Sequence, residues 1–437
     1  MEAATGLSGG SRALSRDGDF LRLWSGETIS LFGTQVTVLA LPLTAVLTLD
    51  ASAGQLGLLN AARFAPFIAV ILFAGVWVDR RRRRPILIQT NVGRALLVGA
   101  IPAAAVFELL RMEVLYAVGF LVGVLTVFFD LAYQSYLPSL VGRAQLTAAN
   151  SRLEASRSAA EVGGPGIGGL LVQVASAPYA LLVDAVSFLV SGALLSSIRH
   201  EEAPPPPAAD DREGVLRAIR GGFRLTFANR YLRPIAGEAA TFNLFEQAIM
   251  TVFVLYAVRE LGLTAGLLGL IISVGAAGAF VGAVAAPYPA RRWGLGPTIV
   301  SAMAIACTVP LALPAVDGAP ATAVPLLAAT FFVWGLAVAI SNVHVVSLRQ
   351  AATPDHLLGR VNASYRFFTY GAIPIGALFG GFLGEAIGLR ATLLVSALGL
   401  LLALLWVIAS AVARLSELPA RPDAVAARAS GNRPLER

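Results

Sequence analysis

The chain has 437 residues, of which 57% are hydrophobic and only 14% are charged, and its mean hydropathy is +0.73. Soluble globular domains carry about 25% charged residues, so this composition predicts a protein that crosses a membrane several times. The net charge of +7 comes from arginine alone because the sequence contains no lysine, which excludes P-loop nucleotide hydrolysis and Schiff-base catalysis by this chain.

Twelve apolar runs follow a polar N-terminal tail, residues 1–19, which we expect to stay in the cytosol. The hydrocarbon core of a bilayer is about 30 Å thick and takes about 20 helical residues to cross, and the runs meet that length. The sequence therefore predicts an all-α membrane protein with twelve transmembrane helices. The expected spans are 24–47, 54–78, 85–108, 114–137, 153–175, 178–197, 235–258, 264–287, 297–316, 322–347, 363–386 and 390–413.

One acid and five consecutive arginines, Asp79 and residues 80–84, join the second and third runs. Short arginine-rich loops stay on the cytoplasmic side of a membrane during insertion. The even-numbered loops carry more of the remaining arginines than the odd-numbered loops do. We therefore expect a multi-pass protein of the cytoplasmic (inner) cell membrane with both termini in the cytosol. The basic charge is interpreted as a topology signal rather than as nucleic-acid binding.

A polar linker, residues 199–231, separates the sixth and seventh runs. Its consecutive prolines and aspartates cannot enter lipid, and the pattern over 215–224 is typical of an amphipathic helix on the inner membrane surface. The linker predicts an N-terminal six-helix bundle over 20–198 and a C-terminal six-helix bundle over 232–413. The remaining residues, 414–437, are rich in Ala, Arg and Pro, and we expect a disordered cytosolic tail.

A single ungapped offset of 212 residues relates the two halves of the chain. The pairs that it aligns include Gln35 and Gln247, Pro85 and Pro297, Asp130 and Asn342, Asn150 and Asn362, and Gly164 and Gly376. Such a repeat predicts two pseudo-symmetric six-helix bundles. Because six is even, both bundles enter the membrane in the same direction, and a site between them near the midplane is expected.

These features resemble the major facilitator superfamily over essentially the whole chain, including a loop of the form Gly75-x-x-x-Asp79-Arg80-x-x-Arg83-Arg84. Three shorter motifs are similar to those of its proton-coupled drug and natural-product exporters, which include macrolide-efflux and siderophore-export proteins. They are Ile29-Ser-Leu-Phe-Gly33 with Ala40-Leu-Pro42, Val183-Asp184-Ala-Val-Ser-Phe188, and Leu358-Gly359-Arg360-Val-Asn362. The resemblance implies a secondary active transporter with the major facilitator fold, and not an enzyme.

The arginine loop departs from the family pattern at Arg82, where the family usually has a glycine in a tight turn. Asp79 lies at a helix end, where it could pair with arginine and meet the N-terminus of a helix in the other half when the cytosolic side is closed. The alternative is that the arginines only mark topology. The resemblance implies a cytosolic gate formed by Gly75, Asp79, Arg80, Arg83 and Arg84.

The fifth run contains a glycine-proline stretch that resembles a motif of superfamily antiporters, formed here by Gly164, Pro165, Gly168 and Gly169. Small residues permit close helix contact, and the proline permits a kink. We expect the eighth run to face this stretch through Gly275, Gly278 and Gly282. Ordinary small-residue packing is the alternative, and both interpretations can hold together.

Ionisable side chains inside apolar runs are candidates for proton coupling because an unpaired charge is unfavourable in lipid. Glu246 lies halfway along the seventh run, and burial favours its protonated form, so it could bind and release protons near neutral pH. The alternative for Glu246 is a structural hydrogen bond, and Asp130 of the fourth run is the second candidate. The fourth run lacks the embedded arginine of the superfamily's best-known proton antiporters, so the sequence does not predict coupling by that particular arrangement.

The resemblance implies that the first, fourth, seventh and tenth spans line a central cavity. The side chains expected to contact substrate there are Gln35, Tyr133, Phe242, Asn243, Gln247, Trp334 and Asn342. Other ionisable residues near or within the spans are expected to pair across helices, namely Arg63, Arg94, Arg157, Glu161 and Asp184. We assign no chemistry to three residues toward the cytosolic ends, where hydration lowers the penalty of a charge: Glu27, Glu238 and His344.

Cysteine and histidine are too sparse to build a site. Cys307 is the only cysteine and lies in an apolar run, which excludes a disulfide framework. His200, His344 and His356 are too scattered for a zinc signature. The sequence therefore predicts no metal site and no cofactor.

The sequence as a whole predicts export of amphipathic small molecules, such as drugs or macrolide-like or siderophore-like natural products, by proton-coupled alternating access. An uptake carrier or uniporter of a small metabolite is the alternative, and the glycine-proline stretch favours export. The expected partners are a small-molecule substrate, protons and the lipid bilayer, with no nucleic acid. We expect the protein to act as a monomer.

Overall fold

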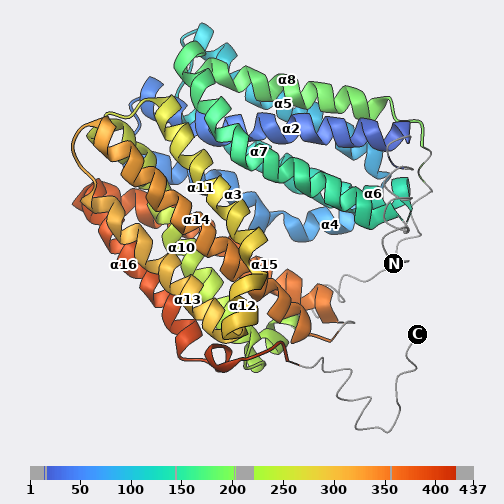
Figure 1. The fold of residues 1–437 in the computed structure, drawn as a ribbon. Helices are drawn as coiled ribbons and strands as arrows, with labels where there is room; N and C mark the ends of the chain where they lie inside the picture. Colours follow the sequence, from blue (N-terminus) through green and yellow to red (C-terminus); the bar gives the residue numbers. More distant parts are fainter. Residues whose placement is uncertain are drawn as a thin grey trace. The chain divides into compact units, whose positions relative to one another are not determined.

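The computed structural model describes Leu14 and residues 17–142, 145–200, 202, 221–354 and 357–419. These residues form helices joined by short connections, and none of them lies in a β-strand (Figure 1). The predicted all-α fold is confirmed. Most of the predicted N-terminal tail, amphipathic linker helix and C-terminal tail falls outside the described residues, so these three features stay predictions.

The first half contains the helices of the first six predicted spans (Figure 1). The second span is divided into two helices, and the first ends in a π-helical turn. In chain order the elements are α2 (Gly18–Leu43), η1 (Thr44–Thr48), α3 (Ala53–Ala69), α4 (Ile71–Asp79), α5 (Arg83–Val106), α6 (Met112–Val141), α7 (Leu146–Ala175) and α8 (Ala177–Ser196).

The second half contains the helices of the remaining six spans, with one short connecting helix. In chain order they are α10 (Leu232–Leu255), η3 (Tyr256–Glu260), α11 (Ala265–Ala285), α12 (Pro287–Trp293), α13 (Leu295–Thr308), η4 (Val309–Ala315), α14 (Pro320–Ala351), α15 (Leu358–Ile387), α16 (Leu389–Ile408) and η6 (Ala411–Arg414). All twelve predicted spans are thus helical.

Ten of the helices in the described ranges are long and apolar enough to cross a membrane, judged by length and composition. The other two predicted spans miss that standard for different reasons. The second span is interrupted at Val70, where α3 ends and α4 begins, so each of its two helices is too short to qualify. The fifth, α7, begins at Leu146 and carries charged residues in its first half, including Arg152 and Glu154.

The predicted repeat is confirmed by backbone conformation. The π-helical turns η1 and η3 are 212 residues apart, and the same offset relates the bounds of α7 to those of α15 and the bounds of α8 to those of α16. Positive φ angles also recur at this offset, at Asp50 and Gly262 and at Ser176 and Gly388. Two six-helix bundles with the same internal plan are therefore built from the two halves.

Contacts group the chain into two compact units. Unit 1 comprises Met1–Ala208 together with Val254–Ser273, and unit 2 comprises Ala209–Phe253 and Val274–Arg437. Residues Val254–Ser273 follow the linker in sequence but pack with unit 1. We call them the docking segment.

Glycine allows the closest helix contacts inside each unit. In unit 1, α2 packs along α7 and α8, and a Cβ at Gly33 of α2 would overlap Ser187 of α8. In unit 2, α13 packs along α14 and α16. Figure 1 shows α2, α5 and α8 running side by side.

Candidate functional site

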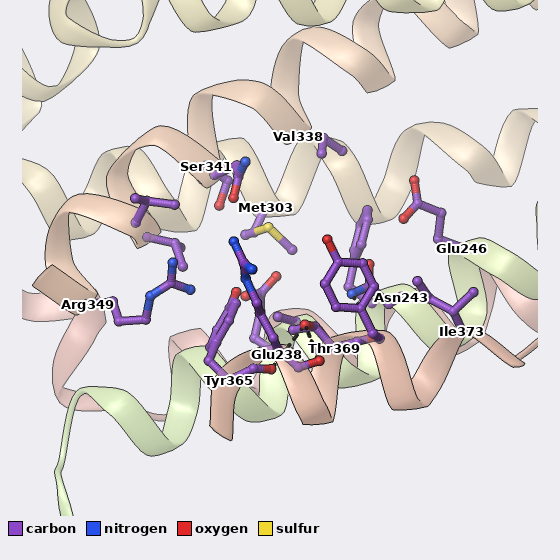
Figure 2. Close-up of a pocket in the computed structure, with 17 residues that line it drawn as sticks. Glu238, Asn243, Glu246, Met303, Val338, Ser341, Arg349, Tyr365, Thr369 and Ile373 are labelled. Atoms are coloured by element: carbon purple, nitrogen blue, oxygen red, sulfur yellow. Dashed lines mark hydrogen bonds between the residues drawn. The ribbon is translucent and has the colours of Figure 1, made fainter. Parts of the chain in front are cut away.

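A partly open cavity of about 390 Å³ lies in unit 2, lined by α10, α13, α14 and α15 (Figure 2). Protein pockets that bind small ligands span roughly 300–1,000 Å³ and are mostly apolar, with a few polar groups that orient the ligand. Met303 of α13, Val338 of α14 and Ile373 of α15 supply apolar surface here. The volume is therefore within the range of pockets that bind small molecules.

One face of α10 presents two carboxyl groups to the cavity, those of Glu238 and Glu246, with Phe242 between them. Residues four positions apart lie on the same side of an α-helix, and each residue adds 1.5 Å along its axis. The two acidic residues are therefore about 12 Å apart along α10.

Glu246 is the predicted proton-coupling residue, and it is half-buried at the cavity wall. Within the described residues its carboxyl group has no hydrogen-bond or ion-pair partner. Figure 2 shows it at the opposite side of the cavity from Arg349. The structural hydrogen bond that was the alternative for this residue is not observed in this part of the chain.

Glu238 was missed by sequence reasoning, which placed it at a hydrated helix end. In the structure it is only 6% exposed, lines the cavity, and has no hydrogen-bond or ion-pair partner in the described ranges. The start of α10 is covered by α16, because Trp406 packs so closely on Gly237 that a Cβ there would lie 2.7 Å from its ring. The available signal was the spacing of eight residues, which puts Glu238 on the face of Glu246.

Two arginines line the cavity as well, Arg349 from α14 and Arg366 from α15. The guanidinium of Arg349 lies 4.0 Å from the ring centroid of Tyr365, a cation–π contact, and its buried Nε has no hydrogen-bond partner among the described residues. The cavity therefore contains two acidic and two basic groups, none of which forms an ion pair with another in the described chain.

Three of the predicted substrate contacts line this cavity: Phe242, Asn243 and Asn342. The Asn243 amide donates to the carbonyl oxygen of Thr369 at 3.3 Å, which orients it between α10 and α15. The two other candidates of unit 2, Gln247 and Trp334, do not line it. Their side chains contact Thr251 and Phe331, respectively.

The remaining predicted site residues belong to unit 1. Gln35 of α2 packs against Gly164 of α7, where a Cβ would overlap it. Tyr133 of α6 stacks on Phe129 at 5.8 Å, and its buried hydroxyl has no partner among the described residues. Asp130 is exposed on α6, and its charge acts on Arg94 of α5.

Arg94 shows how unit 1 accommodates a buried charge. It is 5% exposed, its guanidinium lies 4.1 Å from the Phe129 ring and 4.4 Å from the Phe188 ring, and it donates to Asn91 at 2.5 Å. Aromatic faces stabilise a desolvated cation by roughly 2 kcal/mol or more. The predicted cross-helix pairing is observed here, through rings of α6 and α8.

The other charges that were expected to pair across helices behave differently from one another. Asp184 of α8 accepts a hydrogen bond from Thr37 of α2 at 2.5 Å, which joins two helices as expected. Arg157 instead lies 3.9 Å from Glu154 of its own helix, with both side chains exposed. One helical turn brings these two side chains together, while the charge of Arg157 also acts across helices on Glu27 of α2.

Two residues of the predicted gate, Arg83 and Arg84, begin α5 and are anchored. The Glu202 carboxylate accepts the backbone N–H groups of Arg83 and Arg84, at 2.7 and 3.2 Å, and the Arg83 side chain at 3.2 Å. Arg84 donates to the carbonyl oxygens of Leu195 and Ser196 at the end of α8. Glu202, which the sequence reasoning did not single out, thus fastens the chain after α8 to the start of α5.

The rest of the arginine loop is more open. Arg80, Arg81 and Arg82 are exposed, and Arg81 lies 5.0 Å from the Trp77 ring. Arg82 has φ −64° and ψ 132°, an unstrained extended conformation, whereas its counterpart in the repeat, Gly294, has φ +85°. The side chain of Asp79 lies outside the described residues.

For Gly75, the first residue of the predicted gate, no atom of the described residues lies within 4 Å of a Cβ built there. Packing in this structure gives no reason for glycine at that position. The gate itself stays a prediction.

The glycine-proline stretch of α7 forms close contacts with the docking segment. Gly166 N–H donates to Ser273 Oγ at 2.9 Å. A Cβ at Gly169 would overlap the carbonyl oxygen of Ala265, and one at Gly269 would overlap that of Pro165. On another side of α7, Gly168 lies against α2 at Val36. The stretch therefore allows α7 to touch two helices at backbone distance.

The expectation that Gly275, Gly278 and Gly282 face α7 is wrong. These glycines of α11 pack against α14, at Phe331, Phe332 and Leu336. Gly266 and Gly275 are two and a half helical turns apart, so their positions point in opposite directions. One face of α11 therefore meets α7 while the other meets α14.

The docking segment is also held by charge. Arg259 of η3 donates to the Asp50 carboxylate at 2.5 Å and to the carbonyl oxygen of Ala51 at 2.9 Å. Asp50 is 94% exposed, so this ion pair adds at most about 1 kcal/mol.

The chain is similar to known transporters over most of its length. The sequence profile of the Major Facilitator Superfamily matches residues 23–377. The chain is 32% identical over 395 residues to the multidrug efflux pump Tap of Mycolicibacterium fortuitum, which covers 88% of this chain and 93% of that protein. It is 28% identical over 391 residues to the multidrug efflux pump Tap of Mycobacterium tuberculosis, covering 84% and 87% of the two chains.

Solved structures share the fold at low sequence identity. The nucleoside transporter NupG matches with a TM-score of 0.73 at 12% identity, over 90% of this chain and 98% of that one. A bacterial homologue of the iron transporter ferroportin, in an inward-facing state, matches with a TM-score of 0.68 at 20% identity, over 90% and 98%. With twelve helical spans in two repeated halves and this match along most of its length, the chain belongs to the Major Facilitator Superfamily and is a multi-pass membrane transporter.

Proposed function

We propose that this transporter exports amphipathic small molecules, such as drugs or related natural products, and that proton movement into the cell drives the export. The observation that carries the proposal is Glu246, an acidic side chain without a partner in the described chain, in the wall of a cavity of about 390 Å³. The names of the two relatives, both multidrug efflux pumps, support the substrate class.

The lining of the cavity supports an amphipathic ligand. Phe242, Val338 and Ile373 offer apolar contact, while Asn243 and Asn342 offer amide groups that can orient a polar end. Burying apolar surface contributes about 25 cal/mol per Å², so binding needs few specific hydrogen bonds and tolerates varied shapes.

Glu246 supplies the coupling in this proposal. An isolated ionised carboxylate is strongly disfavoured when it is buried without a cation, so Glu246 is neutral when the cavity is dry and ionises when water enters. Opening to the outside loads the proton, and opening to the inside releases it. One proton moved through about 100 mV contributes about 2.3 kcal/mol, which sustains roughly a 50-fold gradient of a neutral substrate.

The topology proposed for this cycle follows the arginine loop. We place the loop and both termini in the cytosol and the protein in the inner cell membrane, because arginine-rich loops are retained inside. Asp79 with Arg80 forms the part of the cytosolic gate that changes during the cycle, whereas Arg83 keeps its contact with Glu202 and Arg84 keeps its contacts with the end of α8. The protein is proposed to act as a monomer.

Retention of fluorescent dyes, macrolides and siderophores tests this function in cells that express the wild-type chain or Glu246→Gln. We expect wild type to lower retention of at least one compound, a protonophore to abolish the effect, and Glu246→Gln to behave like wild type with protonophore. Glu113→Gln is the matched control, since Glu113 is an exposed acid in the first turn of α6. Full proton-dependent export by Glu246→Gln would exclude the role given to Glu246.

The direction of flux separates export from the alternative of uptake or uniport. Inside-out vesicles that hold the protein should accumulate the substrate when their lumen is acidified. Accumulation only in right-side-out vesicles, or flux without regard to the proton gradient, would establish the alternative.

A further inference from the structure

Glu238 shares the cavity with Glu246 and has no part in the coupling described so far. It is 6% exposed, and no hydrogen bond or ion pair reaches its carboxyl group within the described residues. A buried acid that only stabilises a fold has partners that offset the loss of water. The structure therefore leaves this residue without a structural explanation.

Charged and titratable groups face Glu238 from three neighbouring helices. α14 contributes Arg349, which is stacked on Tyr365, and α15 contributes Tyr365 itself and Arg366. The thiol of Cys307 on α13 lies within the electrostatic reach of Glu238. None of these groups forms an ion pair with Glu238 in the described chain.

The position of Glu238 along α10 suggests its use. α10 begins at Leu232, directly after the linker, so Glu238 lies between Glu246 and the linker end of the helix. The acids are about 12 Å apart along the axis, too far for direct proton transfer. The cavity of about 390 Å³ has room for roughly ten water molecules at about 30 Å³ each, which suffices to bridge them.

We propose that Glu238 relays the proton of Glu246 to the linker end of unit 2. The proton on the Glu246 carboxyl passes through cavity water to the Glu238 carboxylate, which leaves Glu246 ionised and Glu238 neutral. Glu238 then gives this proton to water at the linker end and returns to its ionised state. One proton enters and one leaves, so the relay changes the rate of release and not the stoichiometry. This inference rests on the proposed function and names a further proton-carrying residue in it.

The relay predicts a specific defect. Without Glu238 the proton leaves Glu246 slowly, so steps that require release are slow, while steps that only exchange substrate are spared. Glu238→Asp keeps a carboxyl group and restores part of the rate. A merely structural role for Glu238 would impair release and exchange alike.

Purified protein in proteoliposomes with a lumenal pH dye tests the relay, with the compound identified by the retention experiment as substrate. For Glu238→Gln we expect the maximal rate of proton-coupled transport to fall by at least about tenfold, in the range by which proton-transferring groups accelerate reactions. We expect the KM for substrate and the ratio of protons to substrate to stay unchanged. Substrate counterflow at equal pH on both sides should match wild type, which also shows that the variant is folded.

Each outcome has one meaning. An unchanged rate in Glu238→Gln would overturn the relay, and a changed proton-to-substrate ratio would replace it with a second, independent proton site. Loss of counterflow together with coupled transport would also overturn it, in favour of a structural role. If wild type moves substrate without protons, the proposed function itself is wrong. This result is distinguishable from failure of the relay alone, because it is seen in wild type and requires no variant.

Discussion

At the scale of single residues, Glu202 shows that the two halves cap the N-terminus of their third helix with different acceptors. The first N–H groups of a helix need acceptors, and in α5 the Glu202 carboxylate accepts those of Arg83 and Arg84. In the repeat, α13 donates its first N–H groups, from Leu295 and Gly296, to the carbonyl oxygens of Ser416 and Leu415. In each half, the segment that follows the sixth helix therefore caps the N-terminus of the third helix.

Removing the Glu202 carboxylate should weaken unit 1. Glu202→Ala leaves two helix N–H groups and the Arg83 guanidinium, which is 18% exposed, without their acceptor. We expect a loss of about 1–3 kcal/mol in the free energy of unfolding, measured as a lower thermal midpoint in detergent. Glu202→Gln keeps an acceptor and should lose less. Equal midpoints for Glu202→Ala and wild type would contradict this cap.

The two cavity acids show what sequence reasoning could rank and what it could not. Glu246 stands out because it interrupts the middle of an apolar run, where charge is disfavoured. Glu238 lies near the start of the same run, where water normally reaches a side chain. Only the packing of Trp406 on Gly237 reveals that this end of α10 is covered. Burial at a helix end depends on a neighbour that is distant in sequence.

At the scale of elements, α7 packs closely against its neighbours as predicted. The prediction named the wrong face of α11 as the surface that contacts α7. The pattern of small residues in α11 occurs on both faces of the helix, so the sequence pattern does not indicate which face meets which neighbour. The structure assigns Gly269 and Ser273 to α7 and Gly275 to α14.

Adding a methyl group to Gly169 tests the contact between α7 and the docking segment. The Cβ of Gly169→Ala would overlap the backbone carbonyl of Ala265, which cannot move aside as a side chain can. We expect transport activity in cells to fall strongly at an unchanged level of protein in the membrane. Gly163→Ala is the matched control on the same helix, because its Cβ would make an ordinary contact at 3.6 Å with Phe32. Equal activity of the two variants would show that this approach is unimportant for transport.

The twelve predicted spans all contain helices in the structure, since hydrophobic length is a property of the local sequence. Their ends shift by several residues because polar flanking residues extend helices beyond the apolar core, as in α7. The interruption at Val70 was not predicted, and Pro66 lies inside α3 rather than at the break. Proline in a membrane helix is often accommodated by its neighbours, so it does not by itself predict a break.

At the scale of the whole molecule, the repeat connects sequence to architecture most directly. An offset found from a few polar residues also relates helix bounds, π-helical turns and positive φ angles across the two halves. The topology proposed from the arginine loop applies to both halves together and can be measured.

Labelling with a membrane-impermeant maleimide tests this topology. The only cysteine, Cys307, is buried, so wild type is the unlabelled control. Because Arg81 and Glu113 are exposed, Arg81→Cys should react only in inside-out vesicles and Glu113→Cys only in intact cells. The reverse pattern would place the arginine loop outside the cell and would invert the proposed direction of every step.

The amino-acid sequence by itself determined the membrane class, the twelve spans, the repeat and the family resemblance. Hydrophobic length, arginine position and fixed spacing can all be read along the chain without knowing which helices pack together. Tertiary structure decided which polar groups share a cavity and which are tied up elsewhere. It placed Glu238, Glu246 and Asn243 in the lining of one cavity, and it paired Arg83 with Glu202. Burial and partnership depend on contacts between helices that lie far apart in sequence, and these contacts exist only once the helices have packed.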